Sequence, residues 1–282
     1  MRHIVIHIKS PDHRGIISLY TEMLSSLSIN ILKLEQHVEP DDKLFFMRIE
    51  GELLDDKLSI TDLGNHLEET DNKVNGASKV FDKEKKQNIA ILVTKESLPL
   101  YDILIKNQTE EINSNIKTII SNHKILEPIS NQFNIEYRYL DLNNKVQAEE
   151  YLTNILDKEK IDLVVLARYM QIIPDSIVNR YKERMINIHH GFLPAFKGEK
   201  PYHKAWKRGV KIIGATAHYV TKELDEGPII SQDVVSVDHH HSIKELINSG
   251  RNLERNVLVN AIKAHIEHRI MIHGKRTIVF NK

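Results

Sequence analysis

The sequence predicts an α/β protein with two domains: an N-terminal ferredoxin-like α+β domain followed by a Rossmann-like α/β domain. Three observations support this prediction. Residues 3–81 alternate between strand and helix patterns in the order β-α-β-β-α-β, which is typical of the ferredoxin-like arrangement. Two later segments, 89–94 and 161–167, are nearly continuous apolar runs, as expected for parallel strands buried on both faces. A charged stretch without apolar periodicity, 81–88, separates the two patterns.

The N-terminal domain is predicted from six short elements. Residues 15–27 place apolar side chains at helical spacing, whereas residues 29–39 alternate between apolar and polar side chains. The turn 39–43 then leads into a return strand, which predicts a hairpin. The predicted elements are strands at 3–10, 29–39, 44–51 and 73–81, and helices at 15–27 and 56–69.

The charged stretch 81–88 is interpreted as a linker, and the alternative is a solvated loop inside one larger domain. We therefore predict a first domain at residues 1–82, a linker at 83–88 and a second domain at 89–282. Strands and helices alternate in the second domain, which predicts an open sheet with helices on its faces. Its further elements are strands at 116–121, 135–140 and 185–190, helices at 145–159 and 242–268, a hairpin-like stretch through 228–237 and two closing strands within 269–280.

Composition excludes several classes of protein. The chain of 282 residues has 39 basic and 39 acidic side chains, and this zero net charge argues against a nucleic-acid-binding surface. The chain contains no cysteine, which excludes disulfides and thiolate metal sites. No apolar run approaches the length of a membrane span, and residues 1–10 lack the apolar core of a signal peptide. We therefore expect a soluble cytoplasmic protein with no nucleic-acid or membrane partner.

A histidine-rich segment, 186–206, begins in one of the predicted strands. Alternate residues of a strand face the same way, so Asn187 and His189 are expected on one face, at the end where open α/β sheets bind ligands. An asparagine amide can donate to a developing oxyanion, and a histidine can transfer protons near neutral pH. His190 is expected on the opposite face in a structural role, and His203 is a weaker candidate.

A second candidate segment, 213–230, combines small and polar residues. Gly214 and Ala215 would allow close approach of a backbone or a ligand. His218 lies in a strand-like run, and Asp225 lies in a turn from which its carboxylate could orient a histidine or a water molecule. Together with the first segment, these residues suit hydrolysis or transfer of a small acyl group.

Two other interpretations of these polar residues remain open: they bind a metal ion, or they are incidental. His189, His218 and Asp225 have suitable donor atoms, but the sequence has no H-E-x-x-H motif or similarly close pair of ligands. Residues 239–241 are three histidines before a predicted helix, which we interpret as a solvated helix entry. The turn 95–102 contains no glycine, so it is neither a dinucleotide fingerprint nor a P-loop.

Five short motifs can be compared with known families: L-A-R-Y-M at 166–170, N-I-H at 187–189, F-L-P at 192–194, G-A-T-A-H at 214–218 and L-D-E-G-P at 224–228. Together they resemble the formyltransferase fold that acts on 10-formyltetrahydrofolate. The turn at 10–15 and the element order of the first domain are similar to those of an ACT domain. An ACT domain followed by a formyltransferase domain is the layout of the formyltetrahydrofolate deformylase family, which the chain resembles over essentially its whole length.

The resemblance implies hydrolysis of 10-formyltetrahydrofolate to formate and tetrahydrofolate, which supplies formate and balances one-carbon folate pools for purine synthesis. It implies no metal and no cofactor, because the folate is the substrate. The catalytic residues that it implies are Asn187, His189 and Asp225, with His218 and Gly214 expected to support them. The folate-binding residues that it implies are Met170, Gln171, Ile172, Thr221 and Leu224.

The roles of the three catalytic residues follow from the same resemblance. Asn187 and a protonated His189 are expected to hold the formyl oxygen, and Asp225 is expected to position the attacking water. One residue departs from the family pattern, which has serine after the paired histidines where this chain has Gly191. We expect this change to affect the loop or a hydrogen bond near His189 rather than the class of reaction.

The ACT-like domain is expected to regulate or to assemble the enzyme. Such domains commonly pair edge to edge and bind amino acids near the turn after the first strand. Asp12 and Gly15 are therefore candidates for an effector site or an interface. We expect a homo-oligomer, either a dimer or a tetramer, and the alternative to an amino-acid effector is a role in oligomerisation alone.

Three other functions are weighed against hydrolysis. Formyl transfer to an amine acceptor, as in glycinamide ribonucleotide formyltransferases, would need a phosphate cradle that the turn 95–102 does not provide. Formylation of methionyl-tRNA would need a further domain and a basic surface, neither of which the sequence predicts. A non-catalytic amino-acid sensor would have no need of Asn187, His189 and Asp225 together.

Overall fold

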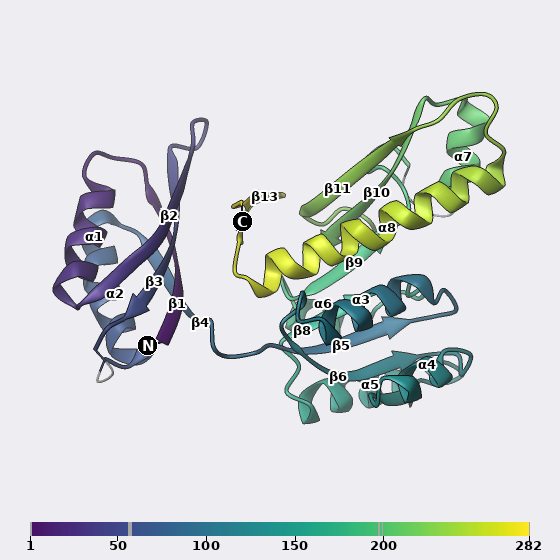
Figure 1. The fold of residues 1–282 in the computed structure, drawn as a ribbon, viewed down its shortest axis with the longest axis horizontal. Coiled ribbons are helices and arrows are strands. Elements are labelled where there is room, and N and C mark those ends of the chain that lie inside the picture. Colours follow the sequence, from purple (N-terminus) through teal and green to yellow (C-terminus); the bar gives the residue numbers. More distant parts are fainter. Residues whose placement is uncertain (1, 56–57, 197, 199, 282) are drawn as a thin grey trace. The chain divides into compact units, whose positions relative to one another are not determined.

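The computed structural model describes residues 2–55, 58–196, 198 and 200–281, and the chain divides into two compact units (Figure 1). Two C-terminal stretches lie with the N-terminal unit and not with the second predicted domain. Their apolar side chains explain this placement, because Met271 and Phe280 pack against Phe46 of the N-terminal sheet. Unit 1 consists of Met1–Lys86, Glu267–Met271 and Ile278–Lys282, and unit 2 consists of Gln87–Ile266 and Ile272–Thr277.

Unit 1 contains a four-stranded antiparallel sheet in the order β2-β3-β1-β4. The chain runs through this unit in the predicted order β-α-β-β-α-β, which with this strand order is the ferredoxin-like connectivity. The strands are β1 (Arg2–Pro11), β2 (Ile29–Glu39), β3 (Leu44–Leu53) and β4 (Ala77–Asp82).

Two helices, α1 (Ile16–Ser26) and α2 (Ile60–Val74), cover one face of this sheet. Alternate residues of β1 project toward that face, and Ile4, Ile6 and Ile8 are fully buried there. They pack against apolar residues that recur at helical spacing on the two helices. The residues contributed by the helices are Ile16, Tyr20, Leu24, Leu63, Leu67 and Val74.

Helix α2 is displaced along the sequence from its predicted position, 56–69. Residues 56 and 57 lie outside the described residues, and the helix begins after Ser59 because Ser59 and Asp62 form a capping box. It ends at Asn75, which is left-handed with φ 50°. The fourth strand therefore starts at residue 77, later than predicted.

Unit 2 contains a seven-stranded sheet in the order β11-β10-β9-β8-β5-β6-β7. The five strands from β5 to β9 pair in parallel, whereas β10 and β11 run antiparallel to their neighbours. The predicted Rossmann-like α/β sheet is confirmed. The strands are β5 (Asn88–Val93), β6 (Asn115–Ser121), β7 (Glu136–Tyr139), β8 (Leu163–Leu166), β9 (Met185–His189), β10 (Ile212–Tyr219) and β11 (Ile229–Ser236).

The strand order fixes where a ligand would bind. From β5 the chain builds outward through β6 and β7, and it then returns to place β8 and β9 on the other side of β5. The switch point lies between the C-terminal ends of β5 and β8, where open α/β sheets bind ligands. Thr94 follows β5 at this point, and Arg168 follows β8.

Helices cover the sheet of unit 2, and α8 packs against β9, β10 and β11 (Figure 1). The central strands are buried throughout, as their continuous apolar sequences predicted. Across the described residues, no helix is both long and apolar enough to cross a bilayer. The helices are α3 (Leu98–Gln108), α4 (Glu127–Gln132), α5 (Lys145–Lys158), α6 (Asp175–Arg180), α7 (Pro201–Arg208) and α8 (Ile243–Ile266), and a hairpin of β12 (Ile270–His273) and β13 (Arg276–Val279) follows.

Candidate functional site

Two antiparallel strands, β9 and β10, carry most of the polar residues of the candidate site. Asn187 on β9 lies opposite His218 on β10, and His189 lies opposite Thr216. Residues 187 and 189 are two positions apart in one strand and therefore share a face of the sheet. Asp225 lies in the loop between β10 and β11, and its carboxylate reaches both histidines. The structure thus brings the three predicted catalytic residues together.

Asn187 is held by His218. The Nδ2 atom of Asn187 lies 3.2 Å from His218 Nε2, and His218 Nδ1 lies 2.9 Å from the carbonyl oxygen of Tyr219. Because the carbonyl requires a proton on Nδ1, Nε2 of the neutral ring accepts from the amide. Burial lowers the pKa of His218 and outweighs the opposing effects of the Tyr219 carbonyl and Asp225, which favours this neutral form. The amide is thereby oriented so that its second N–H can donate to a ligand.

His189 is buried, and both of its ring nitrogens face acceptors. Nε2 lies 2.8 Å from the carbonyl oxygen of Phe196, and Nδ1 lies 3.3 Å from Asp225 Oδ2. A neutral imidazole can donate to only one of these acceptors, whereas an imidazolium donates to both. Each ring nitrogen of His189 therefore has an acceptor within reach.

Asp225 has a left-handed backbone, with φ 58°. Its Oδ2 accepts from the backbone N–H of Gly198 at 3.2 Å, and its Oδ1 lies 3.8 Å from His218 Nε2. Burial acts to raise the pKa of Asp225, but the hydrogen bond and charge of His189, together with the Gly198 N–H, lower it below its ordinary value. Asp225 is therefore an ionised carboxylate next to His189.

Thr216 and Gln232 support the loop after His189, and the sequence reasoning did not identify either of them. The Thr216 hydroxyl is buried, donates to the carbonyl of Gly191 at 3.0 Å and accepts from the N–H of Leu193 at 3.1 Å. Gln232 Nε2 donates to the same hydroxyl and to the carbonyl of Leu193, both at 3.0 Å. In the sequence, Thr216 was visible only as part of the G-A-T-A-H motif. That it lies opposite His189 follows from the strand register, which the sequence does not give.

Gly191 lies where the loop passes closest to His189. A Cβ atom at this position would lie 2.9 Å from His189 Nε2, from the carbonyl oxygen of Phe196 and from Pro201 Cβ. None of these atoms is the free end of a flexible side chain, so a larger residue would require the loop to move. Gly191 thus allows the Phe196 carbonyl to reach His189. The position at which this chain has glycine and the family pattern has serine therefore lies next to this hydrogen bond.

Three of the predicted folate-binding residues are exposed apolar side chains on two loops. Met170 and Ile172 follow β8 and are 54% and 85% exposed, and Leu224 follows β10 and is 66% exposed. The backbone N–H of Met170 donates to Thr94 Oγ1 at 2.9 Å, which fixes the first loop at the switch point. Exposed apolar residues beside a polar site are typical of ligand-binding surfaces.

The other predicted positions have varied surroundings. Gln171 is exposed, and Thr221 is half-buried with its hydroxyl donating to the carbonyl of Glu223 at 3.0 Å. Gly214 lies on β10, where a Cβ would be 2.6 Å from the carbonyl oxygen of Asp233. This close approach of backbone is the kind that the small side chain predicted, although it comes from the neighbouring strand and not from a ligand.

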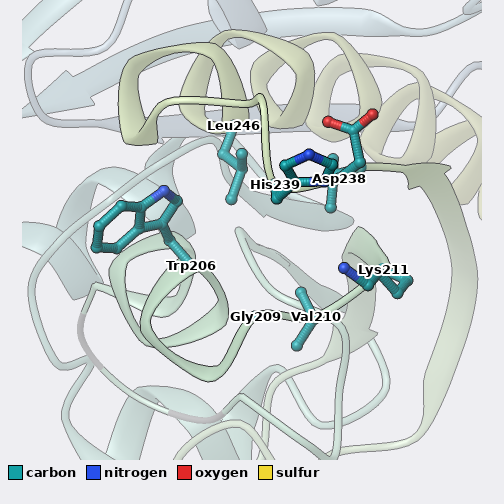
Figure 2. A pocket seen from close by; sticks show the side chains of 8 residues that line it. Trp206, Gly209, Val210, Lys211, Asp238, His239 and Leu246 are labelled. Carbon is teal, nitrogen blue, oxygen red and sulfur yellow. The ribbon is translucent and has the colours of Figure 1, made fainter.

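The remaining histidines lie outside the group around Asp225. His203 is exposed on α7, and His190 is half-buried with its ring centre 5.6 Å from that of His189. Residues 239–241 lie beside a separate hollow, with Trp206 and His239 on its walls (Figure 2). In the parts of the chain that the structure describes, no three His, Asp or Glu side chains are grouped so as to hold a metal ion.

Known proteins match both the whole chain and its second unit. The formyl transferase family model matches residues 87–262. A formyltetrahydrofolate deformylase of Synechocystis sp. is 40% identical over 275 residues, which cover 97% of this chain and 96% of the relative. The crystal structure of a formyltetrahydrofolate deformylase from Pseudomonas syringae has a TM-score of 0.96 at 36% identity, covering 100% of this chain and 95% of that one.

A glycinamide ribonucleotide transformylase from Symbiobacterium toebii is also similar, but over less of the chain. Its TM-score is 0.68 at 26% identity, and the match covers 71% of this chain and 97% of that one. The deformylases therefore match a longer part of this chain than the transformylase does. From the motifs, the geometry of the site and these similarities, we conclude that the chain belongs to the formyltetrahydrofolate deformylase family.

Proposed function

We propose that the protein hydrolyses 10-formyltetrahydrofolate to formate and tetrahydrofolate, with Asn187, His189 and Asp225 as its catalytic residues. The observation that carries this proposal is the convergence of an oriented amide, a histidine with an acceptor at each ring nitrogen and an ionised carboxylate at one edge of the sheet. The similarity to deformylases over nearly the whole chain supports the choice of reaction.

Asn187 supplies a hydrogen bond to the formyl oxygen. A formamide carbonyl is a poor electrophile until donors stabilise the charge that develops on its oxygen. One N–H of the Asn187 amide is used on His218, which leaves the other to donate. Because His218 is itself fixed by the Tyr219 carbonyl, the donor is oriented before the substrate binds.

Asp225 and His189 move the protons. Asp225 Oδ1 accepts a proton from water as the water oxygen bonds to the formyl carbon. The C–N10 bond breaks as N10 takes the proton from His189 Nε2, which in the free protein is hydrogen-bonded to the Phe196 carbonyl. The formic acid that forms gives its proton to the vacant Nε2 of His189 and leaves as formate, and Asp225 releases to solvent the proton that it took from water. His189 Nδ1 keeps its proton, directed at Asp225 across their 3.3 Å contact, and the starting charges are restored.

The folate lies against the exposed residues of the two loops. Met170 and Ile172 on one loop and Leu224 on the other offer apolar surface to the pterin ring, while backbone groups of the first loop provide hydrogen bonds. Gln171 and Thr221 add polar groups on the same two loops. The folate is the substrate, and the proposed steps use no metal and no cofactor.

Transfer of the formyl group to a phosphorylated amine is the alternative. The turn after β5 would have to hold the phosphate, but it contains Glu96, whose carboxylate accepts from Arg251 Nη2 at 2.9 Å. A carboxylate at this position repels a phosphate and occupies the nearby arginine. Glu96 in this turn therefore favours water over a phosphorylated amine as the acceptor of the formyl group.

Formate release separates the two reactions. Purified protein is incubated with 10-formyltetrahydrofolate alone and with added glycinamide ribonucleotide, and formate and formylated product are both quantified. Formate released without the acceptor, at a rate that the acceptor does not change, is the expected result. A product that forms only in the presence of the amine would contradict hydrolysis.

We further propose that the N-terminal domain is an ACT domain that assembles the enzyme into a homo-oligomer and binds an amino acid. The turn between β1 and α1 carries Asp12 and Gly15, and Gly15 has φ 97° at the start of α1. The Asp12 side chain is exposed, and its backbone N–H donates to the carbonyl of Lys43. Sedimentation and formate release are measured for the parent protein and for Asp12→Ala, with and without each amino acid, which tests both parts. A monomer whose activity no amino acid changes would contradict them.

A further inference from the structure

A buried charged cluster lies beside the candidate site and takes no part in the proposed proton transfers. Arg168, in the loop that follows β8, places Nε 3.5 Å from Glu254 Oε2 on α8. The other oxygen of Glu254 accepts from the Tyr202 hydroxyl on α7 at 2.8 Å. The exposed fraction is 20% for the side chain of Arg168 and 2% for that of Glu254.

Several features of this cluster are unfavourable for folding. Arg168 is left-handed with φ 62°, a conformation that costs energy for a residue with a side chain. Apart from their mutual ion pair, Arg168 Nε and Glu254 Oε2 have no hydrogen-bond partner among the described residues, and neither does Arg168 Nη1. Burial raises the pKa of Glu254 although the charge of Arg168 opposes it. Buried ion pairs of this kind seldom stabilise a fold more than an apolar pair would.

Helix α8 is also adapted to the cluster. Gly250 lies one turn before Glu254, and a Cβ at this position would be 2.1 Å from Tyr202 Cζ. The glycine therefore allows the tyrosine ring to lie against the helix with its hydroxyl at Glu254. Glycine inside a helix reduces stability, so this too is a cost of forming the cluster.

The cluster connects two segments that the proposed reaction uses. On one side, the left-handed Arg168 begins the loop 168–172, which carries the exposed Met170 and Ile172. On the other side, Tyr202 is the second residue of α7 and follows Pro201, which lies against Gly191 next to His189. The ring of Tyr202 also lies 5.9 Å from that of His190.

We propose that Arg168 and Glu254 form a buried brace that holds the loop 168–172 in the position required to bind the folate. Arg168 is a positioning residue in this proposal, because it acts through the loop and through Tyr202 and not on the reacting atoms. The proposal rests on the proposed function, because it takes loop 168–172 as the surface that binds the folate substrate. It explains why the chain retains a charged cluster that does not favour folding.

The test compares Arg168→Gly, Glu254→Gln and the double variant with the parent. Glycine adopts φ 62° without steric cost, so Arg168→Gly removes the guanidinium without adding backbone strain. Glutamine keeps an acceptor for the Tyr202 hydroxyl and removes the charge. We expect KM for 10-formyltetrahydrofolate to rise about tenfold in each, with kcat within about threefold of the parent. The KM of the double variant should be no higher than that of the more impaired single variant, because both substitutions break the same ion pair.

Thermal stability distinguishes positioning from a structural role. The double variant removes both buried charges, so we expect its Tm to equal or exceed that of the parent while KM stays raised. Arg168→Lys keeps a positive charge opposite Glu254 and should recover part of the lost affinity. Asp102→Asn is the matched control, because it removes an ion pair with Arg255, which lies next to Glu254 on α8. This variant should leave KM unchanged.

Two results would overturn the brace: an unchanged KM in all three variants, or a rise in KM matched by a fall in Tm in the double variant. Binding of tetrahydrofolate alone, measured by calorimetry, separates this failure from that of the proposed function. A parent that binds tetrahydrofolate but releases no formate contradicts the reaction, and weaker binding by Arg168→Gly would then still support the brace.

Discussion

Asn187 and His218 face each other across the β9–β10 pair, and their side chains meet with Nδ2 of the amide 3.2 Å from Nε2 of the ring. The ring is in turn fixed by the Tyr219 carbonyl. This chain of contacts determines which atom of the Asn187 amide faces the histidine and which remains for a substrate. It is the most direct structural support for an oxyanion donor at this position.

Asn187→Ala removes that donor. We expect kcat for formate release to fall by about 10²–10³-fold, the usual cost of losing one oxyanion donor, with a smaller change in KM. Steady-state formate release is the measurement. The exposed Asn179 on α6 provides the control, and Asn179→Ala should behave as the parent. A kcat within threefold of the parent for Asn187→Ala would remove this residue from the mechanism.

Asp225→Asn removes the carboxylate that we propose as the base while keeping the shape of the side chain. We expect turnover to be largely abolished and the circular dichroism spectrum to be unchanged, because the carboxylate is required for proton transfer. Asp233→Asn replaces an exposed carboxylate on β11 and should leave activity intact. Near-normal turnover by folded Asp225→Asn would contradict the assignment.

Thr216→Val keeps the size of a buried side chain but removes a hydroxyl that makes three hydrogen bonds. We expect the free energy of unfolding to fall by about 1–3 kcal/mol, because the N–H of Leu193 loses its partner. We also expect kcat to fall by about tenfold, because the loop beside His189 loosens. Thr216→Ser keeps the hydroxyl and should recover most of both losses. Equal activities of the Val and Ser variants would argue against this role.

Gly191→Ala tests the close approach of the loop to His189. The added Cβ would displace the Phe196 carbonyl or the imidazole, since each would lie 2.9 Å away. We expect kcat to fall several-fold, in line with about 1 kcal/mol for a weakened hydrogen bond. Gly209→Ala, at a helix end with φ 69°, controls for replacing a glycine in a region where Cβ meets no neighbour. An unchanged kcat in Gly191→Ala would show that the loop adjusts without affecting His189.

The acid sensitivity of the fold should depend on His190. Burial, assisted by the charges of Arg168 and His189, lowers the pKa of His190 to about 3, and Asp225 only partly opposes this. The unfolded chain takes up a proton near pH 6.5 whereas the folded protein does not, so stability falls as pH decreases from about 6.5 toward 3. The contribution is about 2 kcal/mol by pH 5.

His190→Asn should therefore lose less stability between pH 7 and pH 5 than the parent does. Urea unfolding at the two pH values measures the difference, and His203→Asn controls for removal of an exposed histidine. Identical pH dependence in the parent and His190→Asn would contradict the prediction. Other histidines, such as the half-buried His7 with its pKa lowered to about 4, contribute to both proteins alike.

The sequence was sufficient for the parts of the site that depend on local pattern. The shared face of Asn187 and His189 follows from the strand period, and the parallel sheet follows from the continuous apolar runs. The meeting of Asp225 with His189 came from the resemblance to a family, because no periodicity relates positions that are 36 residues apart along the chain. The boundaries of α2 were missed because a capping box at Ser59 outweighed the apolar pattern.

The remainder of the site depends on tertiary contacts that carry no local signature. The Phe196 carbonyl that faces His189 is a backbone group, and any residue type at position 196 would present one. The pairing of Arg168 with Glu254 joins positions in a loop and on a long helix, and neither residue belongs to a recognisable spacing. The consequence of Gly191 likewise became specific only when the three atoms around it were known.

The path of the chain between its two units also affects how the protein could be divided. Because the stretches 267–271 and 278–282 belong with unit 1, the polypeptide passes between the units at residues 86–87, 266–267, 271–272 and 277–278. A protease that cuts within 83–88 would leave a fragment still held by the packing of Met271 and Phe280 on Phe46. Unit 1 is therefore built from three separate stretches of the chain, and removal of residues 2–86 would leave Met271 and Phe280 without Phe46, their apolar partner.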